Sequence, residues 1–194
     1  MPTLSRADLW SLEEYAERRP AFRAQVIAHK KTRQVALGEH ARLYFEDALT
    51  IRYQIQEMLR IERTFDPAGI QDELDAYNPL IPDGGNFKAT MLIEYADPIE
   101  RTERLRQLKG IERLTWLRVD GHAQVFAIAD EDLVRENDEK TSSVHFLRFE
   151  LEAGMRGALK GGAALAMGID HPFYRVALEE VAPELQVSLA ADLD

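Results

Sequence analysis

A strongly amphipathic segment between Phe45 and Phe65 constrains the fold of this chain more than any other stretch. At 100° per residue, its apolar side chains fall within one arc of roughly 160°, which is wide enough to face a protein core. These side chains are Ile61, Phe65, Met58, Ile51, Ile55, Ala48 and Leu59. Asp47 stands at the position of an N-cap, so we predict a helix over about 48–63 that packs against the rest of the molecule.

Two polar residues, Glu62 and Gln54, fall inside the same apolar arc. A carboxylate that leaves water without a partner is strongly destabilising, so a buried Glu62 requires a cation, a metal or hydrogen-bond donors. The alternative is that Glu62 reaches solvent from the last turn of the helix or pairs with an arginine. The opposite side of this segment carries a polar stripe, formed by Glu46, Thr50, Tyr53, Glu57 and Arg60. Glu57 and Arg60 have the spacing of an ordinary surface ion pair.

The remaining pattern divides the chain into a helical part, a sheet part and a helical end. The helical part, about 1–77, is predicted to hold helices over 12–18, 20–31, 48–63 and 67–77, with a small hairpin over 33–45. The sheet part, about 88–151, is predicted to hold strands over 88–95, 113–119, 122–129 and 143–151, a helix over 98–109 and a polar helix before the last strand. The end, about 153–182, is predicted to hold helices over 153–167 and 173–181. A mostly antiparallel sheet with helices before, within and after it predicts an α+β fold, which we expect to be a single domain over 1–194.

Two local features of the sheet part make sharper predictions. The dipeptide Asp120-Gly121 is typical of a two-residue β-hairpin turn, which would pair Trp116 with Val125. The last strand, 143–151, carries apolar side chains on both faces. We therefore expect it to lie centrally in the sheet with both faces covered.

Composition excludes several classes of function. The absence of cysteine excludes disulfides, thiolate catalysis and an iron–sulfur cluster held by this chain's own thiolates. No apolar run approaches the roughly 18 residues that a membrane helix requires, and residues 1–20 lack the apolar core of a signal peptide. We therefore expect a cytoplasmic protein that has no membrane contact. The net charge of −10 argues against general nucleic-acid binding.

Positive charge is concentrated between residues 18 and 38, which contain six Lys and Arg residues and no acidic residue. They are Arg18, Arg19, Arg23, Lys30, Lys31 and Arg33. Such a segment can hold an anionic ligand or an acidic partner, with Arg19, Arg23 and Lys30 as the candidate contacts. Arg60 and Arg148 are candidates for orienting an anionic substrate. The alternative is a solvated helix whose charges pair with the acidic remainder of the chain.

His145 is the strongest candidate among the histidines, because it lies on the strand that is predicted to be covered. A covered imidazole needs a partner for each ring nitrogen. One hypothesis brings His145 together with Glu57 or Glu62, a donor set that suits iron, manganese or zinc. The alternative is a core histidine that is bonded to backbone or to a carboxylate. The acidic run 130–132 is interpreted as the cap and first turn of the polar helix rather than as metal ligands.

Five runs of the sequence resemble those of one bacterial family. They are QIQEMLRIER (54–63), YNPLIPDGG (77–85), KATMLIEY (88–95), ADED (129–132) and KTSSVHFLRFEL (140–151). Over nearly its whole length the chain is similar to the bacterial domain-of-unknown-function family 3501, which supplies no catalytic residues to carry over. The resemblance implies a redox or oxidative-stress setting, with rubrerythrin-like or iron–sulfur proteins as partners.

Three hypotheses about function follow from the sequence. The first is an accessory or binding protein that uses the basic segment and a polar pocket to engage a partner, within a redox system. The second is a metal-dependent enzyme in which Glu57 or Glu62 converges with His145. The third is a small-molecule sensor that performs no chemistry. The sequence leaves the identity of the ligand or metal and the oligomeric state open.

Overall fold

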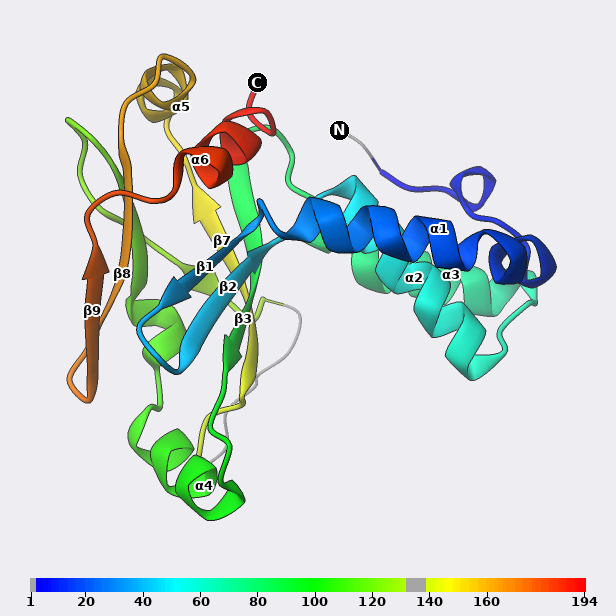
Figure 1. Cartoon of the computed structure of the whole chain (residues 1–194), viewed down its shortest axis with the longest axis horizontal. Coiled ribbons are helices and arrows are strands. Elements are labelled where there is room, and N and C mark those ends of the chain that lie inside the picture. Colours follow the sequence, from blue (N-terminus) through cyan, green and yellow to red (C-terminus); the bar gives the residue numbers. More distant parts are fainter. Residues whose placement is uncertain (1–2, 132–138) are drawn as a thin grey trace.

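The computed structural model describes residues 3–131 and 139–194. These residues form six α-helices, which are α1 (Leu12–Lys30), α2 (Ala48–Glu62), α3 (Pro67–Tyr77), α4 (Pro98–Gln107), α5 (Ala153–Lys160) and α6 (Pro183–Ala190). They also form three short 3-10 helices, η1 (Arg6–Asp8), η2 (Asn78–Leu80) and η3 (Ile111–Leu114). Helices α1, α2 and α3 make an arm that extends to one side of the strands (Figure 1). Helix α4 lies at one end of the strands, and α5 and α6 lie at the other end (Figure 1).

The strands of the described residues form two antiparallel sheets. The five-stranded sheet has the order β1-β2-β3-β7-β6, with β1 (Gln34–Leu37), β2 (Ala41–Phe45), β3 (Asn86–Ile93), β7 (Val144–Glu150) and β6 (Ile128–Ala129). The four-stranded sheet has the order β5-β4-β8-β9, with β5 (Val125–Phe126), β4 (Thr115–Val119), β8 (Leu165–His171) and β9 (Tyr174–Leu178). The predicted α+β class with mostly antiparallel pairing is therefore confirmed.

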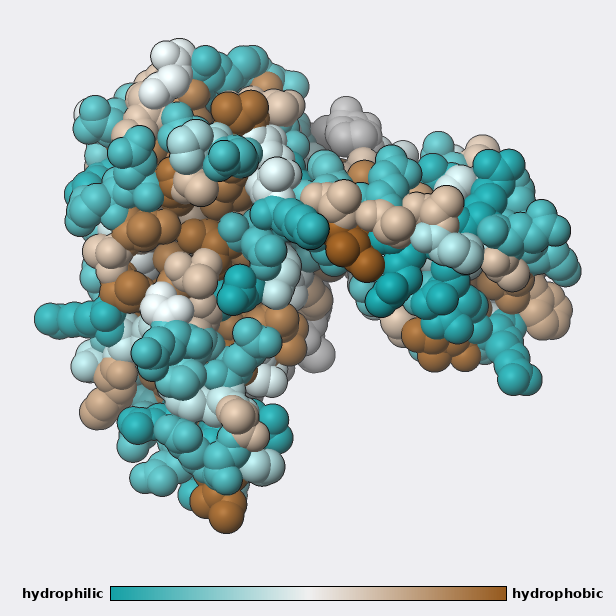
Figure 2. Space-filling view, viewed as in Figure 1, coloured by the Kyte–Doolittle hydropathy of each residue, from teal (hydrophilic) through white to brown (hydrophobic). Residues whose placement is uncertain are grey.

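The main core lies between the inner faces of the two sheets. Alternate residues of each strand point inward, so that Leu43 and Met91 from the first sheet share one apolar cluster with Leu117 and Met167 from the second. Figure 2 shows apolar residues gathered between the two sheets on the face in view, within a largely hydrophilic surface. Tyr174 joins the edges of the sheets, because its hydroxyl donates a 2.7 Å hydrogen bond to the carbonyl of Leu37.

The arm has two smaller apolar clusters of its own. One holds Tyr15, Phe22 and Val26 of α1 against Trp10, Leu49 and Tyr53, and the other holds Ile51, Ile55 and Leu59 of α2 against Leu74 and Ile81. Asp47 caps α2 as predicted, since its Oδ1 accepts a 2.9 Å hydrogen bond from the backbone N–H of Thr50. The predicted central helix, its cap and the hairpin before it are all confirmed.

The first two predicted helices are in fact one. Helix α1 runs without interruption through Pro20, which removes one backbone hydrogen bond from the helix. Pro20 is exposed, whereas Tyr15, Phe22 and Val26 are buried on either side of it in the sequence. Packing of this apolar stripe on α2 holds the helix together across the proline.

The predictions for the end of the chain are correct for the start of α5 at Ala153 and wrong for the residues after Lys160. Helix α5 ends at Lys160, where Gly162 with φ of +93° takes the left-handed conformation that terminates a helix. The segments that follow are the strands β8 and β9, and the last helix, α6, was not predicted. Residues 165–169 are buried one after another, so β8 has no polar face and its composition cannot be told from that of a buried helix.

The hairpin after β4 and the covering of β7 also differ from expectation. Trp116 pairs with Phe126 rather than with Val125, so the register is shifted by one and the loop is longer than the Asp120-Gly121 turn. Along its length β4 pairs with β8, and Ala127 leads into β6 of the other sheet. Strand β7 lies between two partners as predicted, but only its inner face is buried and its outer face is half-buried.

Helix α2 buries a narrower arc than its sequence predicts. Ile61 is 61% exposed and Phe65 is 75% exposed, because this end of the arm extends beyond its neighbours. Gln56 is fully buried in their place, and its side-chain oxygen accepts a 2.8 Å hydrogen bond from the backbone N–H of Trp10. The polar helix predicted before β7 falls on residues 132–138, which lie outside the described residues. In the part of the chain that is described, no helix has both the length and the apolarity needed to cross a bilayer.

Candidate functional site

A cavity of about 340 Å³ lies between the arm and the outer face of the five-stranded sheet, which is the face turned away from the four-stranded sheet. Its walls come from α1, β2, α2, the α3–η2 segment, β3 and β7. The lining residues are Lys30, Tyr44, Glu46, Thr50, Ile51, Gln54, Tyr77, Leu80, Thr90, Leu92, Val144 and Phe146. A mainly apolar wall with a few polar groups is typical of small-molecule sites.

Strand register builds the floor of this cavity. Tyr44 is opposite Thr90 on β3, and Thr90 is opposite Phe146 on β7, so the three side chains form one row across the sheet. Leu92 and Val144 form the next row. Because side chains alternate along a strand, these residues all point away from the core between the sheets. The outer face therefore offers a mixed polar and apolar surface to α2.

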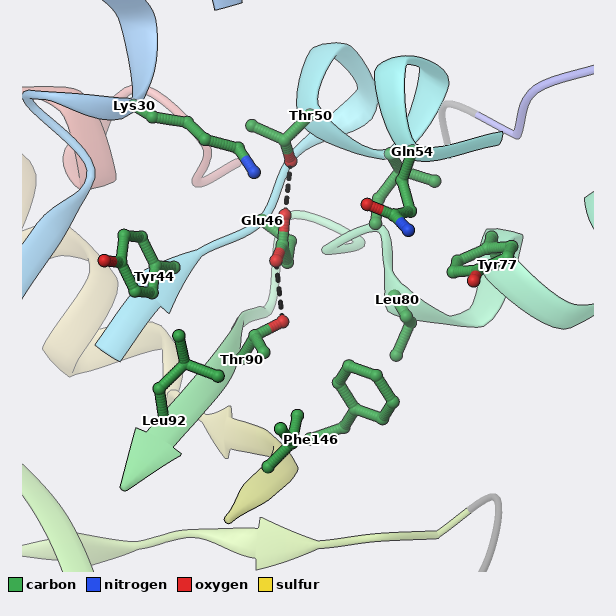
Figure 3. Close-up of a pocket in the computed structure, with 12 residues that line it drawn as sticks. Lys30, Tyr44, Glu46, Thr50, Gln54, Tyr77, Leu80, Thr90, Leu92 and Phe146 are labelled. Atoms are coloured by element: carbon green, nitrogen blue, oxygen red, sulfur yellow. Dashed lines mark hydrogen bonds between the residues drawn. The ribbon is translucent and has the colours of Figure 1, made fainter. Parts of the chain in front are cut away.

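Glu46 is the buried acid of the cavity. Glu46 is the residue directly after β2, and it is only 8% exposed. Carboxylate Oε2 accepts a 2.6 Å hydrogen bond from the hydroxyl of Thr50, and Oε1 accepts a 2.7 Å hydrogen bond from the hydroxyl of Thr90 (Figure 3). Among the described residues, no Lys, Arg or His side-chain nitrogen lies within 4.0 Å of this carboxylate. Glu46 is thus hydrogen-bonded but has no ion-pair partner among the residues that the structure describes.

Lys30 supplies the positive charge of the cavity from the last turn of α1. Its amine points toward the Glu46 carboxylate and the Thr50 hydroxyl (Figure 3). Within the described part of the chain, no carboxylate oxygen lies within 4.0 Å of this amine. The side-chain amide of Gln54 faces the same space from α2 (Figure 3).

A smaller pocket of about 80 Å³ adjoins the cavity and shares Leu80 and Phe146 with it. Arg148 lies here on the outer face of β7, where its Nε and Nη2 donate hydrogen bonds of 2.7 and 2.6 Å to Glu131. These bonds raise the pKa of Arg148 and lower the pKa of Glu131. Lys88 also lines this pocket, and burial lowers its pKa. Arg148 also pairs with Glu150, so two acids of its own chain neutralise it.

Glu57 lies inside the arm and joins α1 to α2. Its carboxylate accepts hydrogen bonds of 2.7 Å from the hydroxyl of Tyr15 and of 2.7 and 2.9 Å from Arg19, and it pairs with Arg60 at 3.1 Å. The hydrogen bonds from Arg19 are the largest cause that lowers the pKa of Glu57 to about 2. The predicted Glu57–Arg60 pair is present, but it is part of a four-residue cluster that links two helices.

The other candidates from the basic segment divide into neutralised and free groups. Arg18 pairs with Glu14 at 2.8 Å. Arg33 is 2% exposed and is paired with Asp192. Arg23 is exposed on α1, and the described residues place no carboxylate within 4.0 Å of it. The basic segment is therefore less positive at its surface than its sequence implies.

Glu62 is exposed at the end of α2, which agrees with the alternative in which it reaches solvent from the last turn of the helix and not with a buried site role. Its position at the far end of the arm explains this, since Ile61 beside it is exposed as well. Glu57, Glu62 and His145 thus lie in different places, two on the arm and one in the sheet core (Figure 1). Among the described residues, no group of three or more His, Asp or Glu side chains is arranged to hold a metal ion.

His145 is 1% exposed and is bonded on both sides of its ring. Nδ1 lies 2.6 Å from Asp130 Oδ2, and Nε2 lies 3.0 Å from the carbonyl oxygen of Ser142. Glu112, which is 2% exposed, has its Oε2 3.9 Å from Nε2. Asp130 has φ of +51° and also accepts a 2.9 Å hydrogen bond from the backbone N–H of Phe146. The acid that pairs with His145 is thus Asp130, and not Glu57 or Glu62.

The sequence analysis did not single out Glu46, Thr50 or Thr90 as site residues. Glu46 and Thr50 do stand on the polar stripe of the amphipathic segment, and this was the available signal. Thr90 gave no signal, because it comes close to Glu46 only through pairing of β2 with β3. Lys30 was predicted as an anion or partner contact and lines the cavity.

The fold and the cavity define the class of this protein as an α+β protein with two facing antiparallel sheets and a helical arm. The family model described as "Protein of unknown function (DUF3501)" matches residues 3–193, and the chain therefore belongs to this family. A crystal structure of a protein of unknown function from Burkholderia pseudomallei K96243 is similar, with 56% sequence identity, a TM-score of 0.95 and 100% coverage of both chains. Comparison with curated proteins finds no match.

Proposed function

We propose that this protein binds a small molecule in the cavity between the arm and the five-stranded sheet. The observation that carries the proposal is Glu46, a carboxylate that is 8% exposed, lines the cavity and has no cation within 4.0 Å among the described residues. Removal of a carboxylate from water is costly unless a charge or several donors compensate it. A guest with a donor group supplies that compensation.

The size and lining of the cavity support the same proposal. Its volume of about 340 Å³ lies in the range of small-molecule sites. Leu80, Leu92 and Phe146 provide apolar surface, and Gln54 adds a polar group. Binding without chemistry corresponds to the accessory-module and sensor hypotheses. The geometry gives no support to a metal site formed by Glu57, Glu62 and His145, because these residues do not converge.

A ligand screen on the full chain tests the proposal. A library of small metabolites and fragments is screened by thermal shift and by ligand-observed NMR, with Val144→Trp as a variant that fills the cavity. Val187→Trp is the matched control, because Val187 is 71% exposed on α6 and does not line the cavity. A cavity ligand at 100 times its dissociation constant stabilises the protein by about 2.7 kcal/mol.

The expected result is a ligand that stabilises the wild type and Val187→Trp but not Val144→Trp. Ligands that stabilise all three proteins equally would place binding elsewhere. A screen without any ligand would overturn the proposed function.

The partner and location expected from the sequence remain predictions. A redox partner of the rubrerythrin-like or iron–sulfur type is tested by mild crosslinking and co-purification from the native host, and a cytoplasmic location by cell fractionation. Elution of the protein alone, with nothing crosslinked, would contradict the partner prediction. Elemental analysis of untagged protein tests the metal alternative, which requires a stoichiometric metal that is lost in His145→Ala.

A further inference from the structure

We infer that the ligand is a zwitterion of the α-amino-acid class that carries an apolar side chain. The inference rests on the proposed function, because it assigns a chemical class to the guest of the same cavity. Its ammonium group binds Glu46, its carboxylate binds Lys30, and its side chain lies on the outer face of the sheet.

The charges of the cavity select a guest with both signs. The amine of Lys30 points toward the Glu46 carboxylate within the same cavity (Figure 3), and neither side chain has an oppositely charged side-chain atom within 4.0 Å among the described residues. A guest with only a positive charge would be attracted by Glu46 and repelled by Lys30, and a guest with only a negative charge would meet the reverse. A zwitterion satisfies both groups at once.

The hydrogen-bonding capacity of Glu46 leaves room for an ammonium group. An ionised carboxylate offers about four lone-pair sites, and the hydroxyls of Thr50 and Thr90 occupy one site on each oxygen. The two threonines hold the carboxylate in one orientation, so its remaining sites are fixed before a guest arrives. Lys30 in turn has three N–H donors for a carboxylate.

The two charged groups and the apolar sheet residues line different parts of the cavity. Lys30 and Glu46 lie near Thr50 of α2, and Leu92 and Phe146 lie on the sheet, on either side of Thr90 (Figure 3). A guest whose charged groups face the helices therefore places its remaining atoms on apolar surface. Burial of CH₂ groups there is favourable, so the cavity favours an apolar amino-acid side chain over a polar one.

The test compares L-phenylalanine with two compounds that each lack one of its charged groups. Binding of L-phenylalanine, 2-phenylethylamine and 3-phenylpropionate to the full chain is measured by isothermal titration calorimetry, with L-leucine as a smaller zwitterion. We expect one of the two amino acids to bind at least tenfold more tightly than either single-charge compound. We also expect Glu46→Gln and Lys30→Met each to weaken that binding at least tenfold.

Two control variants make the same change of charge outside the cavity. Lys31→Met alters the exposed neighbour of Lys30, and Glu39→Gln alters a side chain that is 93% exposed. Both should bind the amino acid like the wild type. If Glu46→Gln is unstable, the binding measured for Lys30→Met decides the outcome, because Lys30 is half-exposed and its replacement should leave the fold intact.

The outcomes separate this inference from the proposed function. Single-charge compounds that bind as tightly as the amino acids, or variants that bind them unchanged, would overturn the zwitterion and leave the cavity site intact. The same conclusion follows if neither amino acid binds while another library compound is excluded by Val144→Trp. If no compound of any kind binds, both proposals fail.

Discussion

Arg33 and Asp192, which are 159 residues apart in the sequence, form a bidentate ion pair. Arg33 directly precedes β1, and Asp192 follows α6, so the pair joins the first strand of the two-sheet sandwich to the last helix. Nη2 of Arg33 lies 2.5 Å from Oδ2 of Asp192, and Nη1 lies 3.3 Å from Oδ1. The same guanidinium donates hydrogen bonds of 3.1 Å to the backbone carbonyls of Phe45 and Glu46. Arg33 therefore fixes the backbone of Glu46, the buried acid of the cavity.

Replacement of Arg33 should be strongly destabilising. Arg33→Met leaves the half-buried carboxylate of Asp192 without its main partner, and loss of one member of a buried pair costs about 3–5 kcal/mol. Urea unfolding, followed by circular dichroism, measures the decrease in the free energy of unfolding. Arg23→Met, at an exposed position of α1, should change the free energy of unfolding by less than about 0.5 kcal/mol. Equal effects of the two variants would contradict a structural role for Arg33.

Glu57 should make stability depend on pH in the acid range. Its pKa in the folded protein is lowered to about 2, chiefly by hydrogen bonds from Arg19, and lies below its ordinary value of 4.5. A lowered pKa contributes stability that is present above pH 4.5 and is lost as the pH falls toward 2. Glu57→Gln should cost about 1.5–3 kcal/mol at pH 7, and this cost should shrink as the pH falls.

The measurement is urea unfolding of wild type and Glu57→Gln at several pH values between 7 and the acid limit of the fold. Glu39→Gln, at a side chain that is 93% exposed, is the control and should follow the wild type throughout. A cost of Glu57→Gln that stays constant as the pH falls would contradict the assigned role.

His145 should stabilise the core through its pairing with Asp130. Nδ1 lies 2.6 Å from Asp130 Oδ2, and Nε2 lies 3.0 Å from the Ser142 carbonyl oxygen and 3.1 Å from the Thr141 hydroxyl. His145→Leu removes this partner from the Asp130 carboxylate and should cost about 3 kcal/mol, measured as a shift of the urea midpoint. His122→Leu, in the turn after β4, should cost less than about 0.5 kcal/mol. A small effect at His145 would show that this pairing adds little to stability.

Gly168 should not tolerate a side chain. A Cβ atom there would lie 2.4 Å from Cζ2 of Trp116 and 2.4 Å from the carbonyl oxygen of Val176, and a backbone atom cannot move away cheaply. Gly168→Ala should cost about 1–3 kcal/mol. Gly157→Ala in α5 is the control, because nothing lies within 4 Å of the new Cβ, and it should stabilise the protein by about 0.5–1 kcal/mol. Thermal unfolding distinguishes the opposite signs.

The helical arm and the two sheets should unfold in one transition, because the sequence predicts a single domain over 1–194. The chain has two tryptophans, Trp10 in an apolar cluster of the arm and Trp116 on β4 of the sandwich. Fluorescence of the variants Trp10→Phe and Trp116→Phe therefore reports on one part at a time. Each fluorescence transition should coincide with the circular-dichroism transition of the same variant. Separate midpoints would mean two independent folding units.

The capped central helix was predicted well, and the reason is physical. The Asp47 cap and the spacing of Ile51, Ile55 and Leu59 specify a helix within about fifteen residues, whatever lies around it. The β1–β2 hairpin has the same advantage. By contrast, β8 is buried along residues 165–169 and shows no alternation, so its neighbours decide its conformation. Strand β9 does alternate, with Arg175 and Ala177 exposed, and this signal was available in the sequence.

The candidate site was predicted only in part, because burial was inferred from one helix at a time. Glu62 lies in the apolar arc of its helix, yet it is exposed because no neighbour covers that end of the arm. His145 was correctly expected to be buried, but its acid is Asp130 from the segment after β6. A helical pattern tells which side chains share a face and does not tell which part of that face is covered.

The sequence by itself determined the α+β class, the capped central helix, the membership suggested by its long family-like runs, and the absence of cysteine chemistry. Tertiary structure alone decided where the cavity lies and which charges meet there. Lys30 ends one helix, Glu46 follows a strand and Thr90 belongs to another strand, so their proximity depends on strand register and on the docking of the arm. Such contacts are long-range, and no local pattern of residues encodes them.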